Sequence, residues 1–257
     1  MIIRKSEAEI AKMAHAGTIL RGCLDLLAGE IGPGVTTKEL DRLAEEYIRS
    51  EGGIPTFKGY RGFPGSICAS PNSMVVHGIP GKMRLNEGDI LGVDVGVTFD
   101  GYIADAAMTY AVGEISELAQ QLMDVTEESL RQAITKCKVG NRVGDISHAV
   151  QTHAEAHGFS VVRSMVGHGV GRDMHEDPQV PNFGPAGQGP ELRDGMVLAI
   201  EPMVNAGHHE VEMGDDSWAI YTKDGSLSAH FEHTVAITKN GPRVLTIAQT
   251  EHAGGPR

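Results

Sequence analysis

The chain has 257 residues, of which 40% are hydrophobic, and a formal net charge of −12 at pH 7. This length allows a substantial core, whereas the acidic balance argues against DNA binding, which needs clustered Lys and Arg. The three cysteines show no CxxC spacing, so a disulfide framework or cysteine zinc site is not expected and a reducing cytoplasm fits. No segment approaches the ~18 apolar residues of a membrane span, and no signal-peptide core is visible, so the chain should be neither inserted into a membrane nor exported.

Two helices are predicted at the start of the chain. Ser6 and Glu9 form a capping box ahead of apolar residues at helical spacing, and a Gly-Pro-Gly run then breaks the pattern. Thr36 and Glu39 form a second capping box, and the helix that follows should stop at a Gly-Gly pair. Short strands and loops should come next.

A β-hairpin that carries two acids is predicted near the middle of the chain. Asp100-Gly101 is the dipeptide that most strongly signals a two-residue hairpin turn. If it forms the turn, Asp94 faces Ala107, and Asp105 is a diagonal neighbour of Asp94 on the same face. Two buried carboxylates side by side are costly unless a proton or a cation holds them together. The hairpin therefore predicts further metal ligands elsewhere.

The second half of the chain repeats the first. Helices are predicted from Ser116 to Ile134 and around 146–157. A run of Leu, Gly, Leu and an acid at spacings of three recurs with an offset of 107 residues, as Leu85, Gly88, Leu91, Asp94 and then Leu192, Gly195, Leu198, Glu201. We expect an α+β fold with two pseudo-symmetric helix-helix-strand halves, about 1–113 and 114–248, whose strands join in one sheet. These halves should form a single catalytic domain, 1–248, followed by a C-terminal tail, 249–257.

The acidic and imidazole side chains in apolar runs form a candidate metal site. A lone strand acid is most often an edge or turn residue, but four of them in apolar surroundings are hard to explain as a solvated face. The set comprises Asp94, Asp105, Glu201 and Glu232, together with His168, whose flanking glycines let backbone crowd a site. The alternative interpretation of His168 is a histidine in a loop that binds no metal. Such oxygen-rich ligands suit two divalent cations and metal-assisted amide hydrolysis, with His77 and His175 left for proton transfer and oxyanion stabilisation.

These residues carry a resemblance to a known family. The motifs VDVG, DAAMTY, GHGVGRDMHEDPQV, LAIEPM and EHTVAIT resemble those of the type I methionine aminopeptidases in their short bacterial form, within the M24 metallopeptidases, over roughly residues 2–247. The resemblance implies a pita-bread fold with a curved antiparallel sheet and two divalent ions, whether Co, Mn, Fe, Ni or Zn. It implies that Asp94 chelates one ion, that Asp105 and Glu232 bridge both, and that His168 and Glu201 hold the other. Glu201 would also assist as a base.

The same resemblance implies the substrate. Such an enzyme removes the N-terminal methionine of nascent polypeptides when the second residue is small, as a cytoplasmic monomer acting at the ribosome. His77 and His175 match the family's substrate-contacting histidines, and the pocket for the first side chain matches Tyr60, Phe63, Cys68 and Trp218. Three apolar positions depart from the common family pattern, and they bear on fine specificity: Phe57, Phe63 and Met174.

Two other functions remain open. Xaa-Pro aminopeptidases and prolidases share the metal pattern, but they usually carry a large N-terminal domain, whereas here the catalytic region begins almost at Met1. His168 and Glu201 are only 33 positions apart, and no long helical insertion like that of the type II enzymes is found. A non-catalytic binding protein on the same fold would be expected to have lost part of the ligand set, which is complete here.

Overall fold

The computed structural model describes residues 1–247, and its four α-helices confirm the predicted ones. Ser6 and Thr36 each accept a hydrogen bond from the backbone N–H three residues on, and the glutamate at that position bonds back to the cap, so both capping boxes are confirmed. The helices are α1 (Glu7–Glu30), α2 (Thr37–Ser50), α3 (Glu117–Thr135) and α4 (Val143–Ala156).

Strands follow the helix pair in each half of the sequence, and β3 of the first half pairs with β12 of the second. The first half has a short 3-10 helix, η1 (Tyr60–Gly62), and the strands β1 (Ile54–Pro55), β2 (Cys68–Pro71), β3 (Met74–Val76), β4 (Ile90–Phe99) and β5 (Tyr102–Ala111). The second half has β6 (Ser160–Val161), β7 (Gly167–Gly169), β8 (Glu176–Val180), β9 (Val197–Ile200), β10 (Met203–Asn205), β11 (Val211–Met213), β12 (Ile220–Thr222), β13 (Ser228–His230), β14 (His233–Thr238) and β15 (Gly241–Val244).

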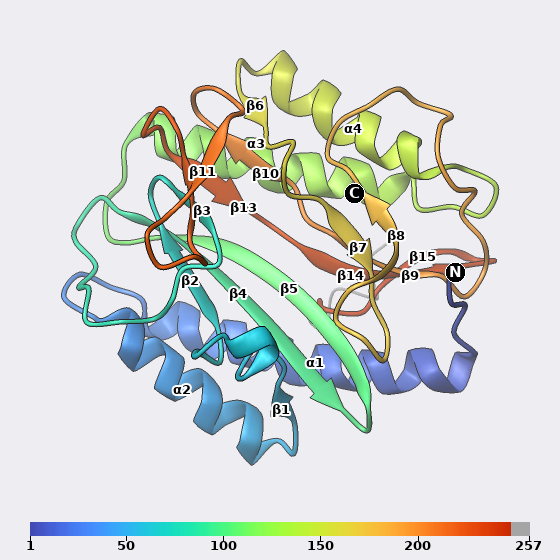
Figure 1. The fold of residues 1–257 in the computed structure, drawn as a ribbon, viewed down its shortest axis with the longest axis horizontal. Helices are drawn as coiled ribbons and strands as arrows, with labels where there is room; N and C mark the ends of the chain where they lie inside the picture. The colour runs from blue at the N-terminus through green and yellow to red at the C-terminus, as the bar shows by residue number, and fades with distance from the viewer. Residues whose placement is uncertain (248–257) are drawn as a thin grey trace.

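Within residues 1–247 the hydrogen-bond ladders group these strands into four antiparallel sheets. The two large sheets contain β1, β2, β4 and β5 from the first half and β15-β14-β9-β7-β8 from the second. A backbone bond from Glu232 to the carbonyl of Ala107 (2.8 Å) and side-chain bonds from Thr234 to Asp105 connect β5 to the β14 segment. The expected single sheet is therefore two large ladders side by side, with two small ones, β13-β10-β6 and β11-β12-β3, beside them (Figure 1).

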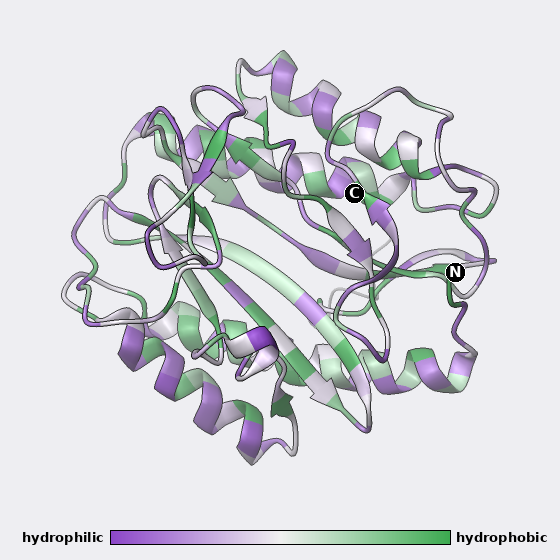
Figure 2. Cartoon of the chain, viewed as in Figure 1, coloured by the Kyte–Doolittle hydropathy of each residue, from purple (hydrophilic) through white to green (hydrophobic). Residues whose placement is uncertain are grey.

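Each half has its own hydrophobic core beneath its helix pair. Leu20, Leu24 and Leu40 of α1 and α2 cluster with Val93 and Val95 of β4, and all five are fully buried. The corresponding core of the second half packs α3 and α4 against β9 and β14. The helices keep their hydrophilic faces outward (Figure 2), and the helix pairs lie at opposite margins of the molecule with the strands between them (Figure 1). The strand faces that remain between the two halves are available to form a site.

The internal repeat is visible in the backbone itself. Gly88 (φ 90°) and Gly195 (φ 86°) take the same left-handed conformation before β4 and β9, respectively. The backbone N–H of Gly34 donates to the carbonyl of Leu85, and that of Gly140, which lies 106 positions later in the chain, donates to the carbonyl of Leu192. Since equivalent turns lead into β4 and β9, the acids that these turns precede, Asp94 and Glu201, occupy related places in the two halves.

The expected C-terminal tail lies outside the described residues. No helix within 1–247 combines the length and the apolarity that crossing a membrane requires.

Candidate metal centre and active site

The β4–β5 hairpin brings the first two acids together with the predicted register. Asp94 pairs with Ala107 and Phe99 pairs with Tyr102, and the turn residues Asp100 (φ 48°) and Gly101 (φ 75°) both have positive φ, as a type I′ turn requires. This register puts the carboxyl groups of Asp94 and Asp105 on the same face of the hairpin, where Asp105 is only 3% exposed. The turn chemistry of the sequence therefore fixes two side chains of the site.

His168 reaches the same point from β7. Its two flanking glycines are required, because a Cβ at Gly167 would lie 2.5 Å from the carbonyl oxygen of Ala199 and one at Gly169 2.2 Å from that of Asp177. The Nδ1–H of His168 donates to the carbonyl of Gly169 (2.9 Å), which leaves the Nε2 lone pair directed at the acids. Nε2 lies 3.8 Å from Oδ2 of Asp105 and 3.5 Å from Oε1 of Glu201.

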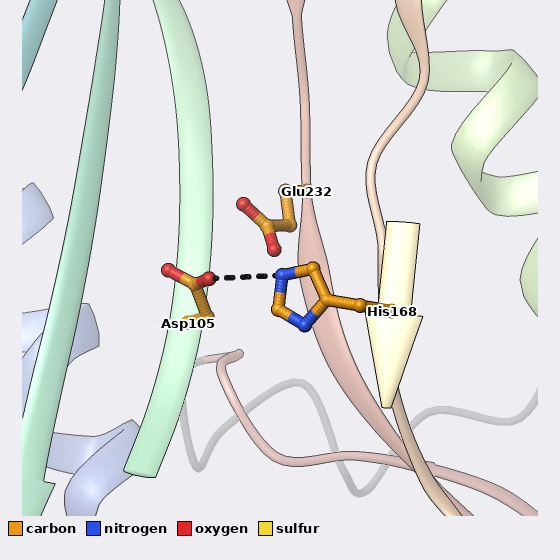
Figure 3. Close-up of side chains that lie close together, drawn as sticks. All are labelled: Asp105, His168 and Glu232. Carbon is orange, nitrogen blue, oxygen red and sulfur yellow. Dashed lines mark ion pairs between the residues drawn. The ribbon is translucent and has the colours of Figure 1, made fainter. Parts of the chain in front are cut away.

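The remaining acids come from the ends of strands in the second half. Glu201 directly follows β9 and Glu232 directly precedes β14, and His233 of β14 pairs with Ile200 of β9. Potential ligand atoms of Asp105, His168 and Glu232 all lie within 4.8 Å of one another. Figure 3 shows these three side chains converging from separate segments of the chain.

The electrostatics of this cluster fit divalent cations. Burial raises the pKa of Asp94 to about 7, and burial together with mutual repulsion raises the pKa values of Asp105, Glu201 and Glu232 well above normal. In the described residues, buried oxygens of Asp94, Asp105 and Glu232 have no hydrogen-bond partner. Buried acceptors without donors are costly, and cations satisfy them directly. Carboxylates with one imidazole form the mixed oxygen and nitrogen set that suits a hydrolytic metal.

A cavity of about 300 Å³ opens above the cluster. All eleven side chains predicted for the site line it: His77, Asp94, Asp105, His168, His175, Glu201, Glu232, Tyr60, Phe63, Cys68 and Trp218. The rings of Phe63 and Trp218 meet edge to face at 5.1 Å, and Cys68, whose thiol has a pKa raised by burial, pairs with Asp94 across β2 and β4. Acids thus form the floor of the cavity, and aromatic and sulfur-containing side chains form its wall.

The two other predicted histidines, His77 and His175, line the same cavity as the acids. His77 has a positive φ of 62°, and the next residue, Gly78, permits this turn because a Cβ there would lie 2.1 Å from the carbonyl of Ala69. Burial lowers the pKa of His77 to about 4, and burial and the nearby Arg61 lower that of His175. Both imidazoles are therefore neutral at pH 7 and are free to exchange hydrogen bonds with a substrate.

Sequence reasoning missed two features of the site. A hydrogen bond joins the hydroxyl of Tyr60 to Nδ1 of His175 (2.8 Å), and it links residues that are 115 positions apart. His230, buried at the end of β13, has its Nε2 3.9 Å from Glu201 and from Glu232. The spacing of two between His230 and Glu232 was a usable signal, because alternate residues of an extended chain face the same side.

Comparison with known proteins identifies the family. Residues 11–239 match the model of metallopeptidase family M24. The methionine aminopeptidase of Clostridium perfringens is 55% identical over 247 residues, which cover 96% of this chain and 99% of that protein. Methionine aminopeptidase 1 of Bacillus subtilis is 52% identical over 246 residues, covering 96% and 99%.

Solved structures give the same result. The methionine aminopeptidase of Thermotoga maritima superposes with a TM-score of 0.95 at 47% identity, over 96% of this chain and all of that one. The prolidase of Pyrococcus furiosus has a TM-score of 0.77 at 22% identity, and this chain covers only 66% of it, so that likeness concerns the fold alone. The chain has the α+β pita-bread fold and belongs to the M24 metallopeptidases and, within them, to the type I methionine aminopeptidases.

Proposed function

We propose that the chain is a metalloaminopeptidase that removes the N-terminal methionine of newly made polypeptides whose second residue is small. The observation that carries the proposal is the buried group of acids and one imidazole with unpartnered oxygens, on the floor of a cavity with an apolar wall. The relatives at 52–55% identity are methionine aminopeptidases, which supports the same activity.

Two divalent cations would be held by Asp94, Asp105, His168, Glu201 and Glu232. Four ionised carboxylates carry more negative charge than one dication neutralises, which favours two ions over one. Bound there, the ions would supply Lewis acidity and lower the pKa of a water molecule, the usual contribution of such centres to amide hydrolysis. Asp105 and Glu232 would each help to hold both ions, because their potential ligand atoms come from opposite halves of the chain and lie within 4.8 Å of one another.

His77 and His175 would act on the substrate and not on the cations. Each is neutral at pH 7, so each can donate a hydrogen bond to a carbonyl whose oxygen gains charge, or can pass a proton to the leaving amine. The hydroxyl of Tyr60, bonded to Nδ1 of His175, fixes the orientation of that ring. Glu201, close to Nε2 of His168, would accept a proton as base.

The wall of the cavity accounts for the choice of methionine. Phe63, Cys68 and Trp218 offer aromatic edges and sulfur, which an unbranched thioether side chain contacts favourably. The substrate's second residue would lie between His77 and His175, where a small side chain fits and a long or branched one collides. A free amine would be required at the N-terminus, because the cleaved bond is one residue away from it.

A peptide panel tests this function. After loading with Co²⁺ or Mn²⁺, Met-Ala and Met-Gly peptides should be cleaved at least ~10²-fold better in kcat/KM than Met-Leu or Met-Lys peptides, a difference of about 2.7 kcal/mol in transition-state binding. Formyl-Met peptides serve as the matched control and should resist cleavage. Equal cleavage of blocked peptides, or a preference for proline at position two with no preference for methionine at position one, would assign the chain to another branch of the fold.

A further inference from the structure

A second histidine faces the acids of the site. His230 ends β13 and is 4% exposed, and its Nε2 lies 3.9 Å from Oε2 of Glu201 and 3.9 Å from Oε2 of Glu232. Among the described residues, this nitrogen is a buried polar atom without a hydrogen-bond partner. A buried imidazole nitrogen left unpaired is costly, so the position calls for a partner. The two carboxylates are the acceptors that the structure offers.

The backbone holds His230 firmly in this place. The hydroxyl of Thr109 on β5 donates to the carbonyl of His230 (2.8 Å) and accepts its N–H (2.9 Å), both inside the core. On its other side, β13 pairs with β10 through Met203. A side chain anchored on two sides and aimed at two ligands is preorganised for a positioning role.

We propose that His230 is a positioning residue of the metal centre, whose Nε2–H bonds the Oε2 oxygens of Glu201 and Glu232 and so leaves their other oxygens to face the cations. The inference rests on the proposed function, because it takes both glutamates to be ligands. At 3.9 Å each nitrogen–oxygen distance is longer than a direct hydrogen bond. A rotation of the carboxylate that moves its oxygen by about 1 Å, or one bridging water molecule, would complete the hydrogen bond.

The structure favours this role over direct ligation. His168 presents a lone pair because its Nδ1–H is fixed on the carbonyl of Gly169, which is the usual arrangement for a ligating imidazole. In residues 1–247, His230 has no such side-chain hydrogen bond to fix its ring in the ligand tautomer. The Nε2 atom of His230 is also equally distant from the Oε2 atoms of Glu201 and Glu232, which suits an N–H donor shared by two acceptors.

Three variants of the full-length protein test the proposal. His230→Leu removes the donor but keeps the bulk, His230→Gln keeps an N–H donor at similar reach, and Ser228→Ala changes another buried polar side chain of the same strand that touches neither glutamate. Calorimetric titration with Mn²⁺ should give affinity ~10–100-fold weaker for the Leu variant. The Mn²⁺ affinity of the Gln and Ala variants should stay within about threefold of the parent value. The Gln variant retains the N–H donor, and the Ala variant changes a side chain that does not touch the glutamates.

Two outcomes would overturn the assignment. One is parental Mn²⁺ affinity in the Leu variant, which would make the contact irrelevant to the cations. The other is a Gln variant that binds Mn²⁺ as weakly as the Leu variant and whose Co²⁺-loaded form has a visible spectrum different from that of the parent. This result would make His230 a metal ligand. If the Leu variant does not fold, His230→Met gives the same comparison. If the parent protein binds no Mn²⁺, the proposed function itself is refuted. If the parent binds Mn²⁺ and the variants bind it with the same affinity, only the role of His230 is refuted.

Discussion

Thr234 joins the two halves of the molecule at the metal centre. It is fully buried in β14, and its hydroxyl accepts the backbone N–H of Asp105 (2.9 Å) and donates to the carbonyl of the same residue (2.8 Å). Thr234→Val keeps the shape but leaves both backbone groups of Asp105 unpaired in the core. Since each buried unpaired group costs ~1–3 kcal/mol, we expect the free energy of unfolding to fall by about 2–5 kcal/mol. Thr234→Ser keeps both bonds and loses one methyl group, which costs only about 1 kcal/mol.

Urea unfolding of the metal-free variants separates these effects. The Val variant should unfold at clearly lower urea than the Ser variant, with the same slope of free energy against urea. Because the lost bonds also hold the main chain of Asp105, the Val variant should bind Mn²⁺ ~10–100-fold more weakly, whereas the Ser variant should resemble the parent. Equal stability and equal Mn²⁺ affinity in the two variants would show that the hydroxyl of Thr234 does not position Asp105.

Three further predictions concern the cations and the acids. Asp105→Ala or Glu232→Ala, or a chelator in the parent, should abolish peptide cleavage while circular dichroism shows the fold retained; full activity in a metal-free preparation would contradict this. His77→Ala and His175→Ala should lower kcat ~10²–10⁴-fold while calorimetry finds unchanged metal affinity, and a parallel loss of affinity would make either histidine a ligand. In metal-free protein the pKa of Asp94 is raised to about 7, so the native state keeps a proton that the unfolded chain releases above pH ~4. The free energy of unfolding should therefore fall as the pH rises from about 4 to 7. Thermal scans should show a higher Tm at pH 5 than at pH 8, and saturating Mn²⁺ should abolish the difference.

Much of the site followed from local sequence because local chemistry fixed it. The Asp100-Gly101 turn determined the register of β4 and β5, and that register set the relation between Asp94 and Asp105. The repeat linked Asp94 to Glu201, since each follows a left-handed glycine at the same spacing. The glycines around His168 indicated close backbone approach, and the structure explains them, because any side chain at either position would collide with a neighbouring carbonyl.

The rest depended on contacts between distant segments. The division of the strands into separate ladders depends on how β5 meets β14, and side chains such as Thr234 bridge that boundary where no ladder forms. The bond between Tyr60 and His175 joins a left-handed loop to a segment of the other half. The spacing of two to Glu232 could have indicated His230, but no spacing in the sequence reports the contact with Thr109 of the opposite half that anchors it.

The twofold plan of the molecule explains why so many acids lie in one place. Each half contributes carboxylates that its own core cannot neutralise, and the mutual repulsion that raises their pKa values acts across the boundary between the halves. Without cations, this charge opposes the close approach of β5 and the β14 segment that the bonds of Thr234 and Glu232 hold together. Cations bound between the halves would turn this repulsion between acids into attraction to a shared positive charge. They would also stabilise the native state, because ligands that bind only the native state do so. With cations bound, these acids would therefore link the two halves as well as line the floor of the cavity.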